Sequence, residues 1–390
     1  MNAAPVNAAA LPAPAPAPTH ALETYLPDAQ RHGIALCLSG GGFRAALFHL
    51  GAVRRLYELG ILDEVRTIVA VSGGSMAAAF LAARCDVWRN RQLTPGEWEQ
   101  AIAEPFRRFT SRNLNVLPIL IGWLPWNWAT NAGLEAFADA CEERGLTRQT
   151  TDDLPATPRF LFATSDLVTG AQWLFKPRQV PTRRIALAVA ASSAFPGFFR
   201  PFTEKTPEHI ALLDGGLNDD RGLEPVWRSH AHLLASDGGD VLQPEWGESV
   251  LWTLARSARV LFNQSTATQK RWLISNLIAG HLKGSYWGIE SSPMHFVGTP
   301  GQSRFDGYTP ELARDVIAVI RTDYDAFSDA EAAVLENHGY FLADAAAHRH
   351  LTDLVQRRVP LSIPHPAWLT ESKVRAALHG SGRKRPFRRR

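Results

Sequence analysis

The sequence Val69-Ala70-Val71-Ser72-Gly73-Gly74 joins an apolar strand directly to a helix through a serine and two glycines. The strand is expected to begin at Thr67, and the helix is expected over residues 75–84. Such a turn is typical of a nucleophile elbow, which presents a serine hydroxyl at the carboxyl end of a sheet strand. The usual elbow has glycine at the position of Ala70, so only its second half matches. The alternative is that Ser72 is an ordinary helix N-cap.

A second strand and helix lie upstream and are joined by three consecutive glycines. The apolar run at residues 34–38 is followed by Ser39-Gly40-Gly41-Gly42 and by a helix expected over residues 43–59, which Gly60 ends. Several backbone N–H groups at one helix N-terminus form a cradle for an anion. The anion could be a phosphate or the oxyanion formed when Ser72 attacks an acyl carbonyl. A tight turn without a ligand is the other interpretation.

This glycine run fits the dinucleotide-binding pattern only loosely. Gly40-x-Gly42-x-x-Ala45 has the spacing G-x-G-x-x-A. However, the next strand ends at Ser72 instead of near an acidic residue that could hold a ribose.

A carboxylate ends a third apolar strand in Leu212-Leu213-Asp214-Gly215-Gly216. If this strand is parallel to the strand before Ser72, both side chains lie at the same edge of the sheet. Asp214 could then accept the serine proton directly. Partial burial would be required, because an ordinary carboxylate is a weak base toward an alcohol. The alternative is that Asp214 caps a turn.

A histidine is the other candidate base. Four of the 13 histidines lie late enough to complete a Ser72–Asp214–His triad in the order found in α/β-hydrolases, namely His230, His232, His295 and His338.

Alternating apolar strands and helices predict one large domain, a three-layer α/β/α sandwich with a mainly parallel central sheet. This domain is expected over residues 33–375, with a helical insertion at 86–157 and a helical C-terminal portion. Further strands are expected at residues 159–164 and 172–175 as a pair, and at 210–213 and 232–235. Further helices are expected at residues 183–191, 248–282 as one or two helices, and 309–346 as a helical pair.

The two ends of the chain differ from this domain in composition. Residues 1–18 hold 8 Ala and 5 Pro, so residues 1–32 are expected to form a disordered leader. The expected C-terminal tail is residues 376–390, of which 383–390 hold six basic side chains and no acidic one. Removing those six charges from the formal net charge of +3 leaves −3. The basicity is therefore confined to the tail, which argues against a nucleic-acid-binding fold.

The remaining composition favours a cytoplasmic protein. Three cysteines do not suggest a disulfide framework, and no apolar run reaches the length of a membrane-spanning helix. The N-terminus lacks the basic start and apolar stretch of a signal peptide. Specialised secretion would leave no trace in these patterns. No spacing of His, Cys or Asp resembles a metal site, and no cofactor is expected.

An apolar, proline-broken segment follows the elbow helix at residues 117–128 and contains Trp123, Trp126 and Trp128. Three tryptophans in six residues suit a membrane interface, and the alternative is a packed wall over the site. The basic tail at residues 383–390 suits an anionic lipid surface, and the alternative is a solvated end.

The three motifs together resemble the patatin-like acyl hydrolases in order and spacing. The resemblance covers residues 33–227. It includes the segment Ala191-Ser192-Ser193-Ala194-Phe195-Pro196-Gly197 and the strand pair around Thr169-Gly170. Ala45 stands where the family usually has glycine, and Ala70 departs from it as described above.

The resemblance implies a lipid acyl hydrolase with a Ser–Asp dyad and no metal. Ser72 would be the nucleophile and Asp214 the base. The N–H groups of Gly41 and Gly42 would form the oxyanion hole, helped by Gly40 or Gly73, with Arg44 beside it. The expected substrate is a lipid or phospholipid acyl ester, hydrolysed through an acyl-enzyme.

Two other function classes stay open on the sequence. One is a nucleotide- or phosphate-binding protein that uses residues 40–42 without a covalent step. The other is an inactive, lipid-binding relative of the hydrolases.

Overall fold

The central sheet of the computed structural model has the strand order β5-β6-β3-β2-β1-β7-β8, with β4 paired to β3 outside this path. The structure describes residues 26–114, 116–127, 130–204, 209–296 and 306–381. The strands are β1 Ile34–Leu38, β2 Val65–Val71, β3 Arg159–Asp166, β4 Gln172–Phe175, β5 Phe202–Glu204, β6 Ile210–Asp214, β7 His232–Asp237 and β8 Lys283–Gly288.

The sheet is mixed around a parallel core. Strands β3, β2, β1, β7 and β8 run parallel to one another. In contrast, β4 and β6 are antiparallel to β3, and β5 is antiparallel to β6. The predicted α/β/α sandwich is confirmed, and the antiparallel strands all lie on the β3 side.

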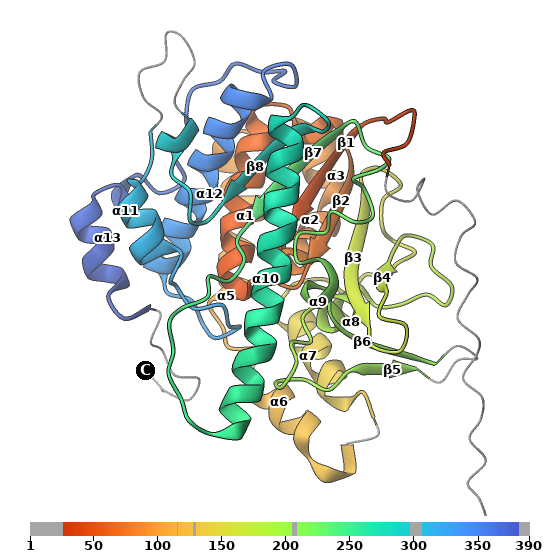
Figure 1. Cartoon of the computed structure of the whole chain (residues 1–390). Helices are drawn as coiled ribbons and strands as arrows, with labels where there is room; N and C mark the ends of the chain where they lie inside the picture. The colour runs from red at the N-terminus through yellow and green to blue at the C-terminus, as the bar shows by residue number, and fades with distance from the viewer. Residues whose placement is uncertain (1–25, 115, 128–129, 205–208, 297–305, 382–390) are drawn as a thin grey trace, which may run out of the picture.

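Helices cover both faces of this sheet (Figure 1). They are α1 Gly42–Glu58, α2 Gly73–Ala82, α3 Cys85–Arg89, α4 Pro95–Trp98, α5 Glu104–Thr110, α6 Val116–Trp123, α7 Ala132–Glu143, α8 Ile185–Ser192, α9 Gly216–Asp219, α10 Val250–Ile278, α11 Pro310–Leu312, α12 Asp329–His350 and α13 Glu371–Leu378. Within the described ranges, no helix is both long enough and apolar enough to cross a membrane.

Alternate side chains of each buried strand enter two different apolar cores. In β1, Leu36 and Leu38 join the larger core, whereas Ala35 and Cys37 join the smaller one. Buried side chains of α1, α2, α8 and α12 complete the larger core. Leu273 of α10 packs into the smaller core, and Figure 1 shows α10 crossing one side of the sheet. The three layers therefore follow directly from the alternation of side chains along the strands.

The C-terminal half differs most from the sequence prediction. Residues 248–282 hold one 29-residue helix, α10, followed by an unpredicted edge strand, β8. The helical pair predicted at residues 309–346 consists of a short helical stretch at 310–317 and the long helix α12. Helix α12 begins where Ser328 and Glu331 form a capping box.

Both predicted domain ends need correction. Helix α13 continues to Leu378, whose side chain is buried, so a tail boundary at residue 376 falls inside this helix. At the other end, the backbone N–H groups of Asp28 and His32 donate to the carbonyls of Arg228 and Ser229. Residues of the predicted leader therefore contact the domain before position 33. Residues 1–25 and the basic stretch 383–390 lie outside the described residues.

Candidate active site

Ser72 lies at the turn between β2 and α2 with a strained backbone. Its φ is 50° and its ψ is −117°, a region that side-chain-bearing residues rarely adopt. An ordinary N-cap serine has an extended backbone and accepts a hydrogen bond from its own helix. The Ser72 side chain makes no such capping bond. The geometry therefore differs from that of a simple N-cap, and a strained serine of this kind is what a nucleophile elbow requires.

The C-terminal end of α8 and the residues just after it contact both the nucleophile candidate and the base candidate. The Ser72 N–H donates to Ser192 Oγ at 2.9 Å, and Ser192 Oγ donates to the Ala163 carbonyl at 2.7 Å. Two residues further on, the Ala194 carbonyl accepts the Asp214 N–H at 3.1 Å. The segment that carries the family resemblance at residues 191–197 thus fixes both backbones.

The strand that ends in Asp214 runs in the opposite direction to the one expected. Strand β6 is antiparallel to β3, whereas β2 is parallel to it, so the condition of two parallel strands is wrong. Val71 pairs with Ala163, and Asp214 pairs with the next residue, Thr164. A side chain at Gly215 would overlap the Ala163 carbonyl and contact Val71. The carboxyl ends of β2 and β6 therefore meet on β3.

The Asp214 carboxyl group is buried, and Oδ1 accepts the Gly216 N–H at 2.9 Å. Burial raises the pKa of Asp214 to about 6, while the Gly216 N–H and the Ser72 hydroxyl act in the opposite direction. A carboxylate with this pKa is a better base than an exposed one and is still ionised at pH 7.

The glycine loop packs directly against the elbow. A side chain at Gly73 would overlap the Gly42 carbonyl, so this close approach requires glycine. The Gly40 N–H already donates to the Asp220 carbonyl at 3.1 Å. Among the described residues, the N–H groups of Gly41 and Gly42 have no acceptor. Of the three predicted oxyanion-hole donors, Gly41 and Gly42 are thus the two still available.

Arg44 is buried and clamps two loops behind the glycine run. Its Nη1 donates to the carbonyls of Ala318 at 2.7 Å and Ile320 at 2.8 Å. Nη2 donates to the carbonyls of Gly238 at 3.0 Å and Gly239. Burial lowers the pKa of Arg44, partly offset by nearby carboxylates. With its donors directed at these carbonyls, Arg44 supports the loop and is not directed at a substrate.

Tyr324 is the site residue that sequence reasoning missed. Its hydroxyl lies 2.8 Å from Ser72 Oγ, although 252 positions separate the two residues. Tyr324 follows no glycine turn and ends no strand. No local pattern marks it as functional.

Within the described structure, none of the four candidate histidines hydrogen-bonds to Ser72 or Asp214. His230 Nε2 contacts Thr67 Oγ1 near the start of β2, and His232 pairs with Asp353. His338 is buried against the Ile289 carbonyl, and His295 accepts the Ser292 N–H. The structure therefore gives the Ser–Asp–His alternative no support.

A second buried carboxyl group, Asp220, lies beside the dyad candidates. A side chain at Gly40 would meet both Asp220 Oδ1 and Ser72 Cβ, and one at Gly216 would meet Asp220 Oδ1 and Asp214 Oδ1. Burial and the charge of Asp237 raise the pKa of Asp220 to about 8. Asp220 also lines a cavity of about 120 Å³ with Lys270 and Phe262, among others.

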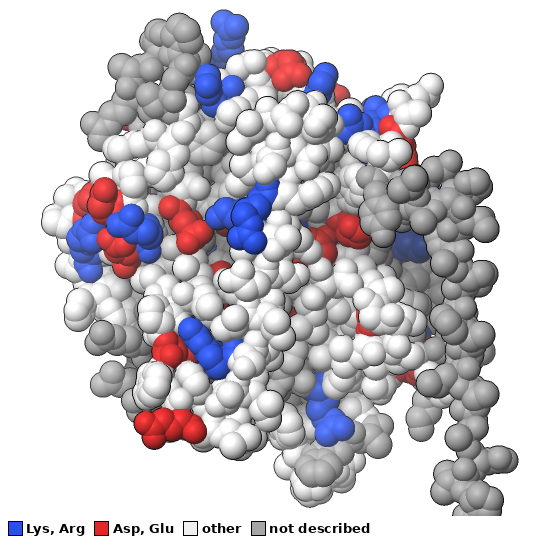
Figure 2. Space-filling view, viewed as in Figure 1, with Lys and Arg blue, Asp and Glu red and all other residues white. Residues whose placement is uncertain are grey.

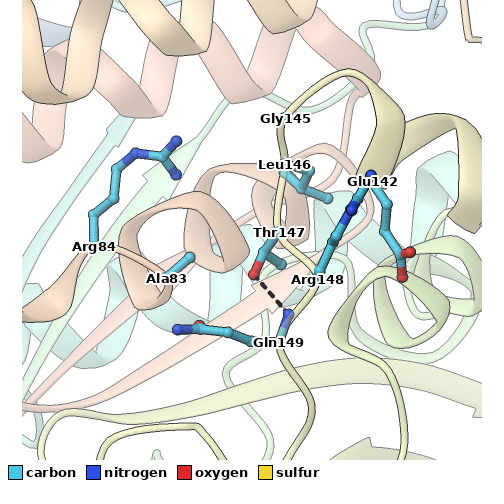
Figure 3. A pocket seen from close by; sticks show the side chains of 8 residues that line it. All are labelled: Ala83, Arg84, Glu142, Gly145, Leu146, Thr147, Arg148 and Gln149. Carbon is cyan, nitrogen blue, oxygen red and sulfur yellow. Dashed lines mark hydrogen bonds between the residues drawn. The ribbon is translucent and has the colours of Figure 1, made fainter.

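A second cavity lies away from Ser72 and Asp214. It has a volume of about 460 Å³ and is lined by Ala83, Arg84 and residues around Gly145, as Figure 3 shows. Ala83 and Arg84 follow the C-terminal end of α2, and Ser72 precedes its N-terminal end. A helix of ten residues is about 15 Å long, so this cavity is separate from the Ser72 site.

No metal centre is evident in the described part of the chain. Nowhere in it do three or more His, Cys, Asp or Glu side chains gather so as to hold a metal ion.

Comparisons with known proteins agree on one family. Residues 36–227 match the model of the patatin-like phospholipases. A patatin-like phospholipase domain-containing protein of Aspergillus oryzae is 30% identical over 197 residues, which cover 46% of this chain and 24% of that protein. One of Aspergillus niger is 31% identical over 195 residues, which cover 46% and 23%. The chain thus aligns with about a quarter of the length of these relatives.

A solved structure shows the same fold at low identity. Human GIVD cytosolic phospholipase A2, in complex with a methyl γ-linolenyl fluorophosphonate inhibitor and terbium chloride, has a TM-score of 0.50 and 14% identity. The similarity covers 85% of this chain and 61% of the human chain. Through residues 36–227, this chain belongs to the patatin-like phospholipase family.

Proposed function

We propose that this protein is a serine hydrolase of lipid acyl esters that uses Ser72 as nucleophile and Asp214 as base. The observation that carries the proposal is the strained Ser72 at the end of β2, met there by the buried carboxyl group of Asp214. A strained backbone persists only where the surrounding structure holds it, and it is common at active sites. Membership in the patatin-like phospholipase family supports the same chemistry.

The reaction proceeds in two steps. Ser72 Oγ forms a bond to the ester carbonyl carbon while Asp214 takes its proton. The bond to the leaving alcohol then breaks, and that alcohol takes the proton from Asp214. Water attacks the resulting acyl-enzyme with Asp214 as base, and Ser72 recovers its proton as the fatty acid leaves. In both steps the N–H groups of Gly41 and Gly42 stabilise the oxyanion.

A row of aromatic rings beside Asp214 offers an apolar surface for an acyl chain. A side chain at Gly216 would contact both Asp214 Oδ1 and the Phe262 ring. The rings of Phe262 and Phe195 lie 6.3 Å apart, and those of Phe195 and Phe198 lie 6.2 Å apart. The row continues to Trp123, whose Nε1–H donates to the Phe198 carbonyl at 3.0 Å. Phe195 and Phe198 are exposed, so this end of the row lies at the surface.

The surface around this end suits a lipid interface. Leu117, Leu120 and Trp123 are exposed at three-residue spacing on α6, and Trp126 follows with 74% of its area exposed. The N-terminal half of α10 also exposes apolar side chains, namely Val250, Leu251, Leu254 and Leu261. Both helices reach the lower end of the molecule in Figure 1, and Figure 2 shows a mostly uncharged surface over the lower part of α10. We infer that the protein contacts membranes peripherally through this face. Trp128 and residues 383–390, which were also predicted to contact lipid, lie outside the described residues.

A fluorophosphonate probe tests the catalytic proposal. The probe is expected to label the wild type in the presence of lipid or detergent and to leave Ser72→Ala unlabelled. Ser111→Ala, which removes an exposed serine, serves as the labelled control. A panel of phospholipids, glycerides and short esters then defines the substrate. An unlabelled wild type would favour a phosphate-binding or inactive lipid-binding protein, which nucleotide and liposome binding would distinguish.

Membrane contact requires a separate measurement. Replacing Trp123 and Trp126 with Ala is expected to weaken liposome binding roughly tenfold, because two large apolar side chains are lost. Hydrolysis of a soluble short ester should change little. Leu369→Ala removes a partly exposed apolar side chain elsewhere and is the control. Equal losses of binding and of soluble-ester hydrolysis would contradict the inferred interface.

The basic tail is tested by truncation at Gly382. Loss of six positive charges should reduce binding to anionic liposomes at low salt and leave soluble-ester hydrolysis intact. Unchanged liposome binding would mean that the tail is only a solvated end.

A further inference from the structure

Tyr324 contacts the nucleophile candidate from a part of the chain that the family model does not cover. The match ends at residue 227, and Tyr324 lies in the loop between α11 and α12. Its hydroxyl oxygen is 2.8 Å from Ser72 Oγ, a normal length for a hydrogen bond between two hydroxyl groups.

The aromatic ring of Tyr324 is held in place by packing. It meets the ring of Phe43 edge-on at a centroid distance of 5.6 Å and that of Phe137 at 5.4 Å. These rings belong to α1 and α7, and the Tyr324 side chain is buried. The backbone is fixed as well, because the Leu114 N–H donates to the Tyr324 carbonyl at 2.9 Å. The hydroxyl group is therefore preorganised at Ser72.

The loop that carries Tyr324 is tied to the glycine run. Arg44 binds the carbonyls of Ala318 and Ile320, and the Phe43 N–H donates to the Asp323 carbonyl at 3.1 Å. Arg321 pairs with Glu331 at the start of α12. The residues after the three glycines thus position both the oxyanion-hole candidates and Tyr324.

Tyr324 stays protonated at physiological pH. Burial raises its pKa well above the usual value, and the negative charge of Asp214 raises it further. The phenol group therefore acts as a neutral hydrogen-bond donor and not as a base. Asp214, with a pKa of about 6, remains the group that can take the serine proton.

We propose that Tyr324 is a third catalytic residue, whose phenol group donates a hydrogen bond to Ser72 Oγ and stabilises negative charge on that oxygen. This role rests on the proposed function. Charge develops on Oγ as Asp214 removes its proton during attack, and again as the bond between Oγ and the acyl carbon breaks during deacylation. Hydrogen bonds to charged oxygen are stronger than those to neutral oxygen. Tyr324 keeps its own proton throughout both steps.

A fragment that ends at residue 227 would retain Ser72 and Asp214 but lack the donor to the nucleophile. The C-terminal portion is then part of the active site and not only a cover for the sheet.

The test compares Tyr324→Phe with Tyr308→Phe in the full chain. Both changes remove one hydroxyl group from a buried ring, and the Tyr308 hydroxyl donates to the Trp368 carbonyl instead of Ser72. We expect Tyr324→Phe to lower kcat for a soluble ester, and the rate of fluorophosphonate labelling, by roughly tenfold to a hundredfold. KM and the ascending pH limb near pH 6 should be preserved, because Asp214 remains the base. Tyr308→Phe should react like wild type.

Each outcome has a distinct meaning. If the wild type is labelled at Ser72 and Tyr324→Phe reacts equally fast, the role of Tyr324 is wrong and the hydrolase proposal stands. A faster Tyr324→Phe also overturns the role, and indicates a contact that holds Ser72 idle. If the wild type itself is neither labelled nor active, the proposed function fails and the role of Tyr324 fails with it. Equal melting temperatures of the two variants exclude misfolding as the cause of a loss.

Discussion

Residues 36–227 and the C-terminal portion contribute to the candidate site in different ways. The first region supplies Ser72, Asp214 and the glycine loop, each marked by a short local pattern. The second supplies Tyr324 and the carbonyls of Ala318 and Ile320 that bind Arg44. The comparison shows that recognisable chemistry and its positioning can come from different halves of one chain.

The largest effect is expected from a substitution within residues 36–227. Asp214→Asn removes the base and should lower the rate of ester hydrolysis about a thousandfold. In the wild type, the pKa of about 6 means that the base is protonated below pH 6, so the rate should fall about tenfold per pH unit there. A pH–rate profile of both proteins checks this expectation. A wild-type profile that stays flat from pH 7 to pH 4 would contradict Asp214 as the base.

The next largest effect is expected from a substitution of Arg44, which connects residues 36–227 to the C-terminal portion. Arg44→Met keeps an unbranched chain but leaves the buried carbonyls of Gly238, Gly239, Ala318 and Ile320 without their donor. We expect a loss of about 3 kcal/mol in the free energy of unfolding, and slower turnover because Tyr324 is displaced. Denaturant unfolding and ester kinetics measure the two losses. Arg108→Met, at an exposed ion pair with Glu104, is the control, and an equal effect there would disprove the clamp.

A smaller effect tests the support within the first region. Ser192→Ala removes the acceptor of the Ser72 N–H and the donor to the Ala163 carbonyl. The elbow should loosen, and the rate of fluorophosphonate labelling should fall roughly tenfold. Thr253→Ala, whose hydroxyl bonds to the Ser249 carbonyl on the exposed start of α10, should have no such effect.

The smallest effect concerns Asp220. Its pKa of about 8 in the folded state exceeds the unfolded value of about 4, so the folded state retains a proton that the unfolded chain releases between these pH values. Folding stability should therefore fall as pH rises through this range. Asp220→Asn lacks this penalty and should melt a few degrees above wild type at pH 8, with little difference at pH 4. If the difference in melting temperature between Asp220→Asn and wild type is the same at pH 4 and at pH 8, the pKa of Asp220 is not raised.

The sequence predicted what depends on local pattern. Apolar strand runs and glycine turns located β1, β2, β6 and β7, and the strand pair β3 and β4, within a few residues. Strand β8, Lys283–Gly288, was missed because its sequence contains lysine, serine and two glycines in place of an apolar run.

Direction and distant contacts were not predictable in the same way. The sequence of β6 is equally compatible with a parallel and an antiparallel strand, and only its pairing with β3 shows that it is antiparallel. Tyr324 reaches Ser72 across 252 positions through packing on Phe43 and Phe137. The sequence predicted Arg44 only as a residue beside the oxyanion hole. Its role in binding the carbonyls of two distant loops becomes visible only in the structure.

The proposed roles of Asp214, Gly41, Gly42 and Tyr324 all depend on Ser72 being an activated nucleophile. The most direct measurement is mass spectrometry of the protein after reaction with a fluorophosphonate, to identify the modified residue. We expect one adduct, on Ser72, which forms more slowly as pH falls below 6 and does not form in Ser72→Ala. An adduct on another residue, or equal labelling of Ser72→Ala, would contradict this expectation.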